Sequence, residues 1–155
     1  MNEITPSSRF PCAGIIVIRE HAHALQTIMV EGEHGHYSFP KGKIEKKKDG
    51  TYLDGAFREL NEETGLCRED VQILTKDNEY HFIEELSAKN NPSVLYFIGK
   101  YVKETKHKFT YDEEELNSVD WFTYRDVLKK CNNGLLKTSR KDVLDKAVDI
   151  YNLHK

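Results

Sequence analysis

The sequence has little cysteine. Cys12, Cys67 and Cys131 lie far apart among 155 residues, and no Cys-x-x-Cys pair occurs. An odd number of widely spaced cysteines does not build a disulfide framework, which excludes a small secreted scaffold held by disulfide bonds. Unpaired cysteines favour a reducing compartment, and we expect a cytoplasmic or nuclear protein.

A long hydrophobic run is also missing. The N-terminal segment MNEITPSSRF is polar and has no apolar core of a secretory signal. No apolar run approaches the roughly 18 residues that a membrane-spanning helix needs. We therefore expect no membrane partner, and we expect residues 1–9 to be a loose lead-in.

A strong excess of one charge is absent as well. The net charge is −3, with 32% charged and 38% apolar residues. This composition is polar but not that of a disordered chain, and the length fits one domain. Because the overall charge does not favour a polyanion, any attraction for a nucleic acid must be local. No repeat, low-complexity segment or linker divides the chain, and no protein partner can be inferred.

What is present is a series of short strand patterns around a longer helix pattern. Runs rich in β-branched and aromatic residues predict strands at residues 12–18, 25–30, 37–39, 71–75, 79–86, 93–102 and 119–124. Loops are expected at residues 20–24 and 90–93, and helices at residues 124–131 and 140–154. Strands mixed with few helices favour an α+β or α/β sandwich over a doubly wound sheet.

The first helix pattern starts near residues 49–51. Apolar or small side chains recur at spacings of three and four, at Leu53, Ala56, Phe57, Leu60 and Thr64. This spacing predicts one buried stripe along the helix. Gly65 follows directly and is expected to end the helix as its C-terminal cap.

Another face of this helix is acidic. Glu59, Glu62 and Glu63 are spaced at i, i+3 and i+4, so they share one side of the helix. Like charges at this spacing repel by roughly 0.2–0.5 kcal/mol per pair. A divalent cation such as Mg²⁺ would remove the repulsion, because it prefers oxygen ligands. A solvated surface produces the same pattern, so the spacing alone does not decide.

The preceding loop carries the opposite charge. Gly42 permits a close backbone approach, and the ammonium groups of Lys41 and Lys43 suit phosphate oxygens. Lysines and a cation around one phosphate are equipment for hydrolysis of a phosphoryl group, because they neutralise its charge while the cation activates water.

The segment RELNEETGL, residues 58–66, resembles the second half of the Nudix signature, Arg-Glu-apolar-x-Glu-Glu-x-Gly-apolar, at every specified position. Gly42 matches the opening glycine, and the order of strands and loop–helix resembles the Nudix fold over almost the whole chain. The resemblance implies one Nudix hydrolase domain over residues 1–155, an α/β/α sandwich with a mixed central sheet. It also implies a pyrophosphohydrolase that uses Mg²⁺ or Mn²⁺.

The resemblance further implies roles by position. Glu59 and Glu63 would bind the catalytic metal, and Glu62 would be a further ligand or orient a water molecule. Arg58 would hold these carboxylates by ion pairs, since a guanidinium suits bidentate pairing. The stretch from Gly42 to Arg58 is two residues longer than is usual in the family. The first Glu of the signature therefore has no clear counterpart, and either Asp49 replaces it or that ligand is absent.

Two segments resemble the messenger-RNA decapping branch of the family. YSFPKGKI, residues 37–44, contains its Phe-Pro-Lys/Arg-Gly-Lys opening, and EELNSVDWF, residues 114–122, resembles its Glu-apolar-x-x-apolar-x-Trp-Phe pattern. This resemblance implies that the 5′ cap of mRNA is the substrate and that Glu115 is the general base, with Glu113 and Glu114 as competitors. The lysines of residues 46–48 would contact RNA phosphates, or they are simply solvated.

Other substrates and a non-catalytic function remain open. Pro-Lys-Gly also occurs in hydrolases of dinucleoside tetraphosphates, and compact Nudix domains act on free nucleotides or diphosphoinositol polyphosphates as well. The diphosphoinositol branch usually has three glycines where this chain has Lys41-Gly42-Lys43. Without its first Glu, the chain is also compatible with a Nudix module that binds a nucleotide or RNA and does not cleave it.

Overall fold

The computed structural model describes residues 9–155, so residues 1–8 of the expected lead-in lie outside the described part. The strands are β1 (Cys12–His21), β2 (Ala24–Gly32), β3 (Tyr37–Ser38), β4 (Lys41–Lys43), β5 (Val71–Ile73), β6 (Thr75–Lys76), β7 (Glu79–Tyr80), β8 (Phe82–Leu86), β9 (Pro92–Tyr101) and β10 (Leu116–Thr123). The helices are α1 (Tyr52–Thr64), α2 (Tyr124–Asn132) and α3 (Thr138–Leu153), with a short 3₁₀ turn η1 (Arg68–Asp70).

One mixed sheet organises the molecule, and its main path is β10-β2-β1-β9-β5. β1 runs parallel to β9, whereas β1 is antiparallel to both β2 and β4. The C-terminal half of β1 pairs with β2 and its N-terminal end pairs with β4. This change of partner places β4, and the loop that leads into α1, at one end of the sheet.

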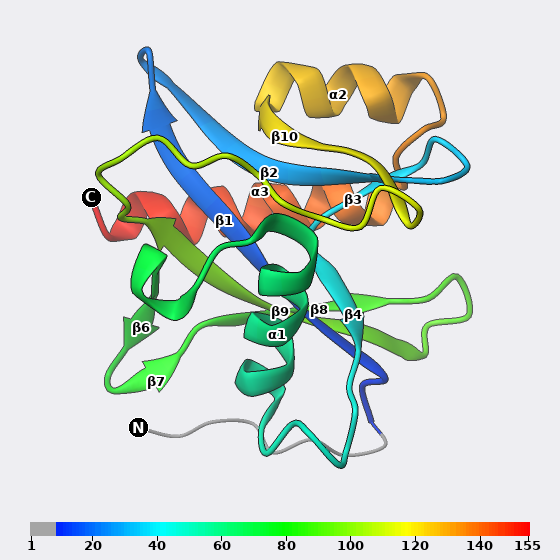
Figure 1. Cartoon of the computed structure of the whole chain (residues 1–155), viewed down its shortest axis with the longest axis vertical. Coiled ribbons are helices and arrows are strands. Elements are labelled where there is room, and N and C mark those ends of the chain that lie inside the picture. Colours follow the sequence, from blue (N-terminus) through cyan, green and yellow to red (C-terminus); the bar gives the residue numbers. More distant parts are fainter. Residues whose placement is uncertain (1–8) are drawn as a thin grey trace.

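Helices cover both faces of the sheet (Figure 1). α1 packs on one face, and α2 and α3 pack on the other. Alternate side chains of β1 enter different cores: Ile15 and Val17 lie in the core under α1, and Ile16 and Ile18 in the core under α3. A strand buried on both faces is apolar throughout. The arrangement confirms the predicted α/β/α sandwich with a mixed sheet.

Local sequence signals account for α1. Thr51 caps its N-terminus by accepting a 3.0 Å hydrogen bond from the backbone N–H of Asp54. Gly65 ends the helix in the left-handed conformation with φ 80°. The predicted stripe is buried, as are the other residues on that side: Tyr52, Leu53, Gly55, Ala56, Phe57, Leu60 and Thr64.

Two expected loops are shorter than the sequence predicts. β1 continues to His21 and β2 begins at Ala24, so the turn contains only Ala22 and His23, with φ of 50° and 65°. Two residues of positive φ form the turn whose twist lets both strands continue up to it. The expected loop at residues 90–93 is also wrong in part, because β9 already starts at Pro92, opposite Leu86 of β8.

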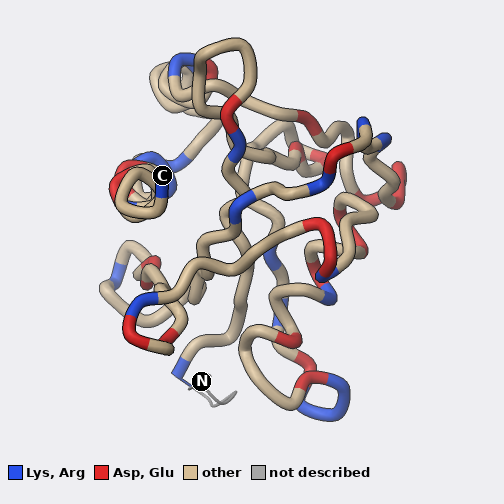
Figure 2. Tube along the Cα trace, turned by 90° about the vertical axis from the view of Figure 1, so that its left-hand side faces the viewer, with Lys and Arg blue, Asp and Glu red and all other residues tan. Residues whose placement is uncertain are grey.

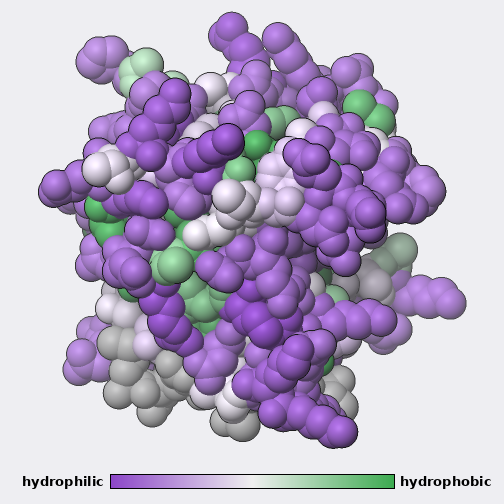
Figure 3. All heavy atoms as spheres, in the orientation of Figure 1, coloured by the Kyte–Doolittle hydropathy of each residue, from purple (hydrophilic) through white to green (hydrophobic). Residues whose placement is uncertain are grey.

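The face that carries α1 is mostly hydrophilic, with apolar atoms visible only in small areas (Figure 3). The loop between β4 and α1 holds a run of basic residues flanked by acidic ones (Figure 2). Between residues 9 and 155, no helix is both long enough and apolar enough to cross a membrane.

Candidate active site

The backbone of β4 positions the acidic face of α1. The N–H of Lys41 donates a 2.9 Å hydrogen bond to Oε1 of Glu63, and the carbonyl of Lys43 accepts a 2.9 Å hydrogen bond from Arg58. Between them, Gly42 leaves the space that the Glu59 carboxylate fills, since a Cβ on Gly42 would lie 2.1 Å from Glu59 Cδ. Each β4 residue thus contacts one charged residue of α1.

The register of β4 gives its lysine side chains a different direction. Gly42 lies opposite Ala13, which belongs to the core under α1. Because side chains alternate along a strand, Lys41 and Lys43 project to the α3 side of the sheet. Lys41 lines a cleft on that side together with Cys12. In the predicted substrate-binding segment, Lys41 to Lys43, the backbone therefore faces the α1 carboxylates. The side chains of Lys41 and Lys43 point to the other side of the sheet.

Arg58 joins the acidic residues. Its guanidinium binds Asp49 through two hydrogen bonds of 3.0 and 2.9 Å, and it donates at 3.0 Å to Glu59 and at 3.3 Å to Glu62. The Asp49 side chain is 1% exposed, and the hydrogen bonds from Arg58 hold its pKa below the usual range. Asp49, the residue considered as a replacement for the first Glu of the signature, is therefore the buried partner of Arg58.

Glu63 is the most strongly perturbed carboxylate of this group. Its pKa is raised to about 7, chiefly by burial and also by the nearby charges of Glu59 and Glu115, while the hydrogen bond from the Lys41 N–H opposes the shift. Burial also raises the pKa of Glu59, against the effect of the hydrogen bond from Arg58. Burial therefore disfavours the ionised forms of Glu59 and Glu63, and a divalent cation beside them would stabilise these forms.

The remaining predicted residues lie at the edge of this cluster. Glu62 is 54% exposed and contacts Arg58 from the solvent side. Glu115 lies in the turn directly before β10, where its N–H donates a 3.0 Å hydrogen bond to the carbonyl of Asp112. Its charge contributes to the raised pKa of Glu63, so these two carboxylates are neighbours in space although 52 positions separate them in the chain.

The donor set fits a hard divalent cation. Glu59 and Glu63 offer carboxylate oxygens, which Mg²⁺ prefers, and burial raises the pKa of each, although Arg58 pairs with Glu59. In the part of the chain that the structure describes, no three acidic, histidine or cysteine side chains are grouped so that they could hold a metal ion by themselves. A few carboxylates that leave coordination positions to water and phosphate are the usual protein contribution to a Mg²⁺ site.

We expect Gly42→Ala to lower turnover by at least about tenfold and to leave the fold intact. The added Cβ would occupy the position of the Glu59 carboxylate, so Glu59 must move away from β4. A misplaced charged group costs catalysis more than stability. Turnover at saturating Mg²⁺ and thermal melting measure the two effects. Gly32→Ala is the matched control, because its Cβ would meet no atom closer than 3.8 Å; equal effects of both substitutions would contradict the prediction.

We expect Glu63→Gln to be more stable than the wild type at pH 8 without metal, by about 5 °C. Burial raises the pKa of Glu63 from 4.5 to about 7, so the folded state binds more protons than the unfolded state between these values. Wild-type stability therefore falls as the pH rises through this window. Melting at pH 5 and pH 8 in EDTA tests this expectation, and Mg²⁺ at pH 8 should remove the difference. A difference in melting temperature between Glu63→Gln and the wild type that is the same at pH 5 and pH 8 would contradict this prediction.

The fold and the acidic helix define a class of protein, an α/β/α sandwich in which a short strand and loop hold a carboxylate-bearing helix. The chain belongs to the NUDIX domain family, whose model matches residues 8–145. It is similar to an RNA pyrophosphohydrolase of Pseudomonas fluorescens, with 41% identity over 71 residues that cover 46% of this chain and 42% of that protein. A protein of Acanthamoeba polyphaga mimivirus named for mRNA decapping is 29% identical over 97 residues, or 61% of this chain and 26% of that protein. The chain thus spans less than half the length of these relatives.

Solved structures share the fold. A C. elegans Ap4A hydrolase superposes with a TM-score of 0.61 and 18% identity, covering 92% of this chain and 96% of that chain. A NUDIX hydrolase from Alicyclobacillus acidocaldarius gives a TM-score of 0.64 at 16% identity, covering 96% and 93%. Identities this low show a common architecture, and they confirm the predicted fold class.

Sequence reasoning missed two features of this region. It took Gly42 as a site of approach for phosphate, whereas the structure places the Glu59 carboxylate against it. It also named no residue after Glu115, although Lys137 and Arg140 line the same cleft as Lys41. The basic residues around the start of the last helix were the available signal, but nothing in the sequence placed them near β4.

Proposed function

We propose that the chain is a divalent-cation-dependent pyrophosphohydrolase that cleaves a phosphoanhydride bond at the 5′ end of RNA, with the mRNA cap as its substrate. The observation that carries the proposal is the half-buried Glu63 carboxylate, which the Lys41 N–H fixes beside Glu59 and near Glu115. The names of the two sequence relatives and the decapping-like segments at residues 37–44 and 114–122 support RNA as the substrate class.

Glu59 and Glu63 would hold Mg²⁺ or Mn²⁺, with Glu62 next to them on the same helix. Such an ion, when bound, neutralises charge on the phosphate oxygens and makes water a better nucleophile. Arg58 holds the helix carboxylates in position by pairing with Glu59 and Glu62, while two further hydrogen bonds go to Asp49. It acts as a positioning residue rather than as a group that touches the substrate.

Glu115 supplies the base in this proposal. A water oxygen forms a bond to a phosphorus atom of the triphosphate bridge, the adjacent P–O bond breaks, and the proton of the water moves to the Glu115 carboxylate. The products are 7-methylguanosine diphosphate and RNA with a 5′-monophosphate. Glu115 is the last of three turn residues and directly precedes β10, so the loop can bring its carboxylate toward Glu63 without moving the sheet.

Side-by-side turnover of four substrates tests the proposal. Capped RNA, the free cap dinucleotide, diadenosine tetraphosphate and a diphosphoinositol polyphosphate are each incubated with the protein and Mg²⁺. We expect the highest kcat/KM for capped RNA, with release of 7-methylguanosine diphosphate. A higher kcat/KM for either of the last two would overturn the RNA assignment. If the protein hydrolyses none of the four substrates but binds at least one of them, the chain is a binding module.

A further inference from the structure

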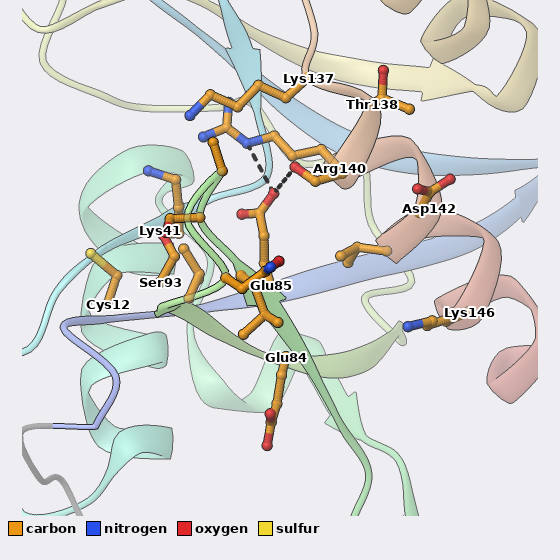
Figure 4. A pocket seen from close by; sticks show the side chains of 17 residues that line it. Cys12, Lys41, Glu84, Glu85, Ser93, Lys137, Thr138, Arg140, Asp142 and Lys146 are labelled. Atoms are coloured by element: carbon orange, nitrogen blue, oxygen red, sulfur yellow. Dashed lines mark hydrogen bonds and ion pairs between the residues drawn. The ribbon is translucent and has the colours of Figure 1, made fainter.

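A second feature borders the site on the α3 side of the sheet. A cleft of about 820 Å³ lies between the β8–β9 hairpin, the start of α3 and the β1–β4 pair (Figure 4). Its size falls within the roughly 300–1,000 Å³ typical of ligand sites. Lys41 links it to the carboxylates, because the main chain of Lys41 contacts Glu63 while its side chain lines the cleft. None of the α1 carboxylates lines the cleft, so a substrate that reaches both has to pass around β4, which pairs only with β1 among the described strands.

Positive charge gathers at the end of the cleft nearest β4. The side chains of Lys41, Lys137 and Arg140 lie together there, whereas Asp142 and Lys146 lie at the other end (Figure 4). α3 also begins at this end, and within the described residues its N-terminus has no capping side chain and no acidic residue in the first turn. The uncapped N–H groups of a 16-residue helix add positive potential to that of Lys41 and Lys137, whereas the charge of Arg140 is paired with Glu85.

A buried carboxylate fixes this end of the cleft. Glu85 is 5% exposed and accepts hydrogen bonds from Ser139 Oγ at 2.7 Å and Tyr96 Oη at 3.3 Å. Arg140 donates a 3.0 Å hydrogen bond to the carbonyl of Tyr37. Its buried Nε lies 3.8 Å from Glu85 Oε2 and has no hydrogen-bond acceptor among the described residues. The guanidinium is thus held in one place, and its Nε is buried away from the cleft.

The lining offers no platform for stacking a base. None of the described residues that line the cleft is aromatic, and its apolar side chains are few and aliphatic, Leu86, Ala88, Val94 and Val143. Proteins that bind the bases of single-stranded RNA use aromatic rings or base-edge hydrogen bonds. Cations and helix N–H groups instead bind phosphates irrespective of sequence.

We infer that this cleft binds the ribose–phosphate backbone of the RNA chain that follows the cleaved bond, with Lys41, Lys137 and Arg140 as phosphate ligands. The inference rests on the proposed function, because it assigns a binding site to the RNA part of that substrate. The nucleotide on the other side of the cleaved bond lies outside the cleft. Recognition of the RNA is therefore independent of its base sequence and sensitive to salt.

Lys137→Glu tests the inference, because Lys137 is exposed and has no ion pair to lose within residues 9–155. Lys76→Glu makes the same charge change on β6, outside the cleft. We expect Lys137→Glu to raise KM for a capped RNA of about ten nucleotides by at least tenfold. KM for the free cap dinucleotide should change less than twofold, and Lys76→Glu should leave both values unchanged. An equal rise for both substrates, or no rise for the RNA, would overturn the inference.

A measurement of RNA binding distinguishes a failure of this inference from a failure of the proposed function. Fluorescence anisotropy with a 5′-monophosphorylated RNA of about ten nucleotides needs no turnover by the protein. In a plot of the logarithm of the binding constant against the logarithm of the salt concentration, we expect the slope for Lys137→Glu to be smaller in magnitude by about one. We expect the same slope for RNAs of different base sequence. If the wild type binds this RNA through the cleft but cleaves no RNA, the proposed function fails and the inference stands. Binding unaffected by Lys137→Glu would overturn the inference even if capped RNA is cleaved.

Discussion

Glu63→Gln is expected to lower kcat by at least about 10²-fold, the lower range for loss of a positioned catalytic group. The glutamine keeps the shape of the side chain and can still accept the hydrogen bond from Lys41 N–H, so the packing of α1 against β4 is retained. What disappears is the negative charge that burial makes costly and that a divalent cation would compensate. The loss should therefore appear in kcat and in cation affinity, and not in folding.

Glu69→Gln is the matched control for this substitution. Glu69 is an exposed acidic residue in η1, so removal of its charge should leave turnover unchanged. Kinetics of both variants at saturating Mg²⁺, with thermal melts of each, separate the catalytic effect from a structural one. Normal turnover of folded Glu63→Gln would remove Glu63 from the mechanism.

Arg58→Met should cause the largest loss of stability, about 3–5 kcal/mol, which corresponds to a fall of about 10 °C in the melting temperature. The substitution leaves the Asp49 carboxylate, 1% exposed, without its partner in a buried position. Arg58→Lys should restore only part of the stability, because an ammonium group cannot make the two parallel bonds to Asp49. Thermal or denaturant unfolding of the three proteins gives the comparison.

The pH dependence identifies Asp49 as the cause. Because Arg58 lowers the Asp49 pKa below 3.8, the pair contributes stability that is present above about pH 4 and is lost as the pH falls through the folded-state pKa. The difference between wild type and Arg58→Met should therefore shrink in acid. The double variant Asp49→Leu/Arg58→Met should recover part of the loss at neutral pH, since neither buried charge remains. A difference that is constant from pH 3 to pH 7 would contradict the assignment to Asp49.

Local patterns predicted α1 well because its determinants are close in sequence. The apolar spacing from Leu53 to Thr64 and the glycine at 65 act within a few residues of one another. Most strands were predicted in position, but β4 was expected as a loop and the strand ends were not predicted, because pairing with a neighbour and not composition decides where a strand forms and stops. Pro92 enters β9 since Leu86 of the adjacent strand lies opposite it.

The site was predicted in its residue types more than in its geometry. The signature named Arg58, Glu59 and Glu63, but the contacts that hold them come from β4, which the sequence presented as a phosphate-binding loop. Strand register alone decides that Gly42 faces α1 and that Lys41 faces α3. The cleft joins Lys41, Glu85 and Arg140, residues so far apart in the chain that only the folded sheet brings them together.

Cation dependence of hydrolysis by the purified chain tests the central claim most directly. Release of 7-methylguanosine diphosphate from capped RNA is followed in Mg²⁺, in excess EDTA and after Mg²⁺ is restored, for the wild type and Glu63→Gln. The account predicts turnover by the wild type in Mg²⁺, none in EDTA, full recovery on adding Mg²⁺ back, and at most about one-hundredth of that rate for Glu63→Gln. Wild-type turnover that persists in EDTA, or that Glu63→Gln matches, would contradict it.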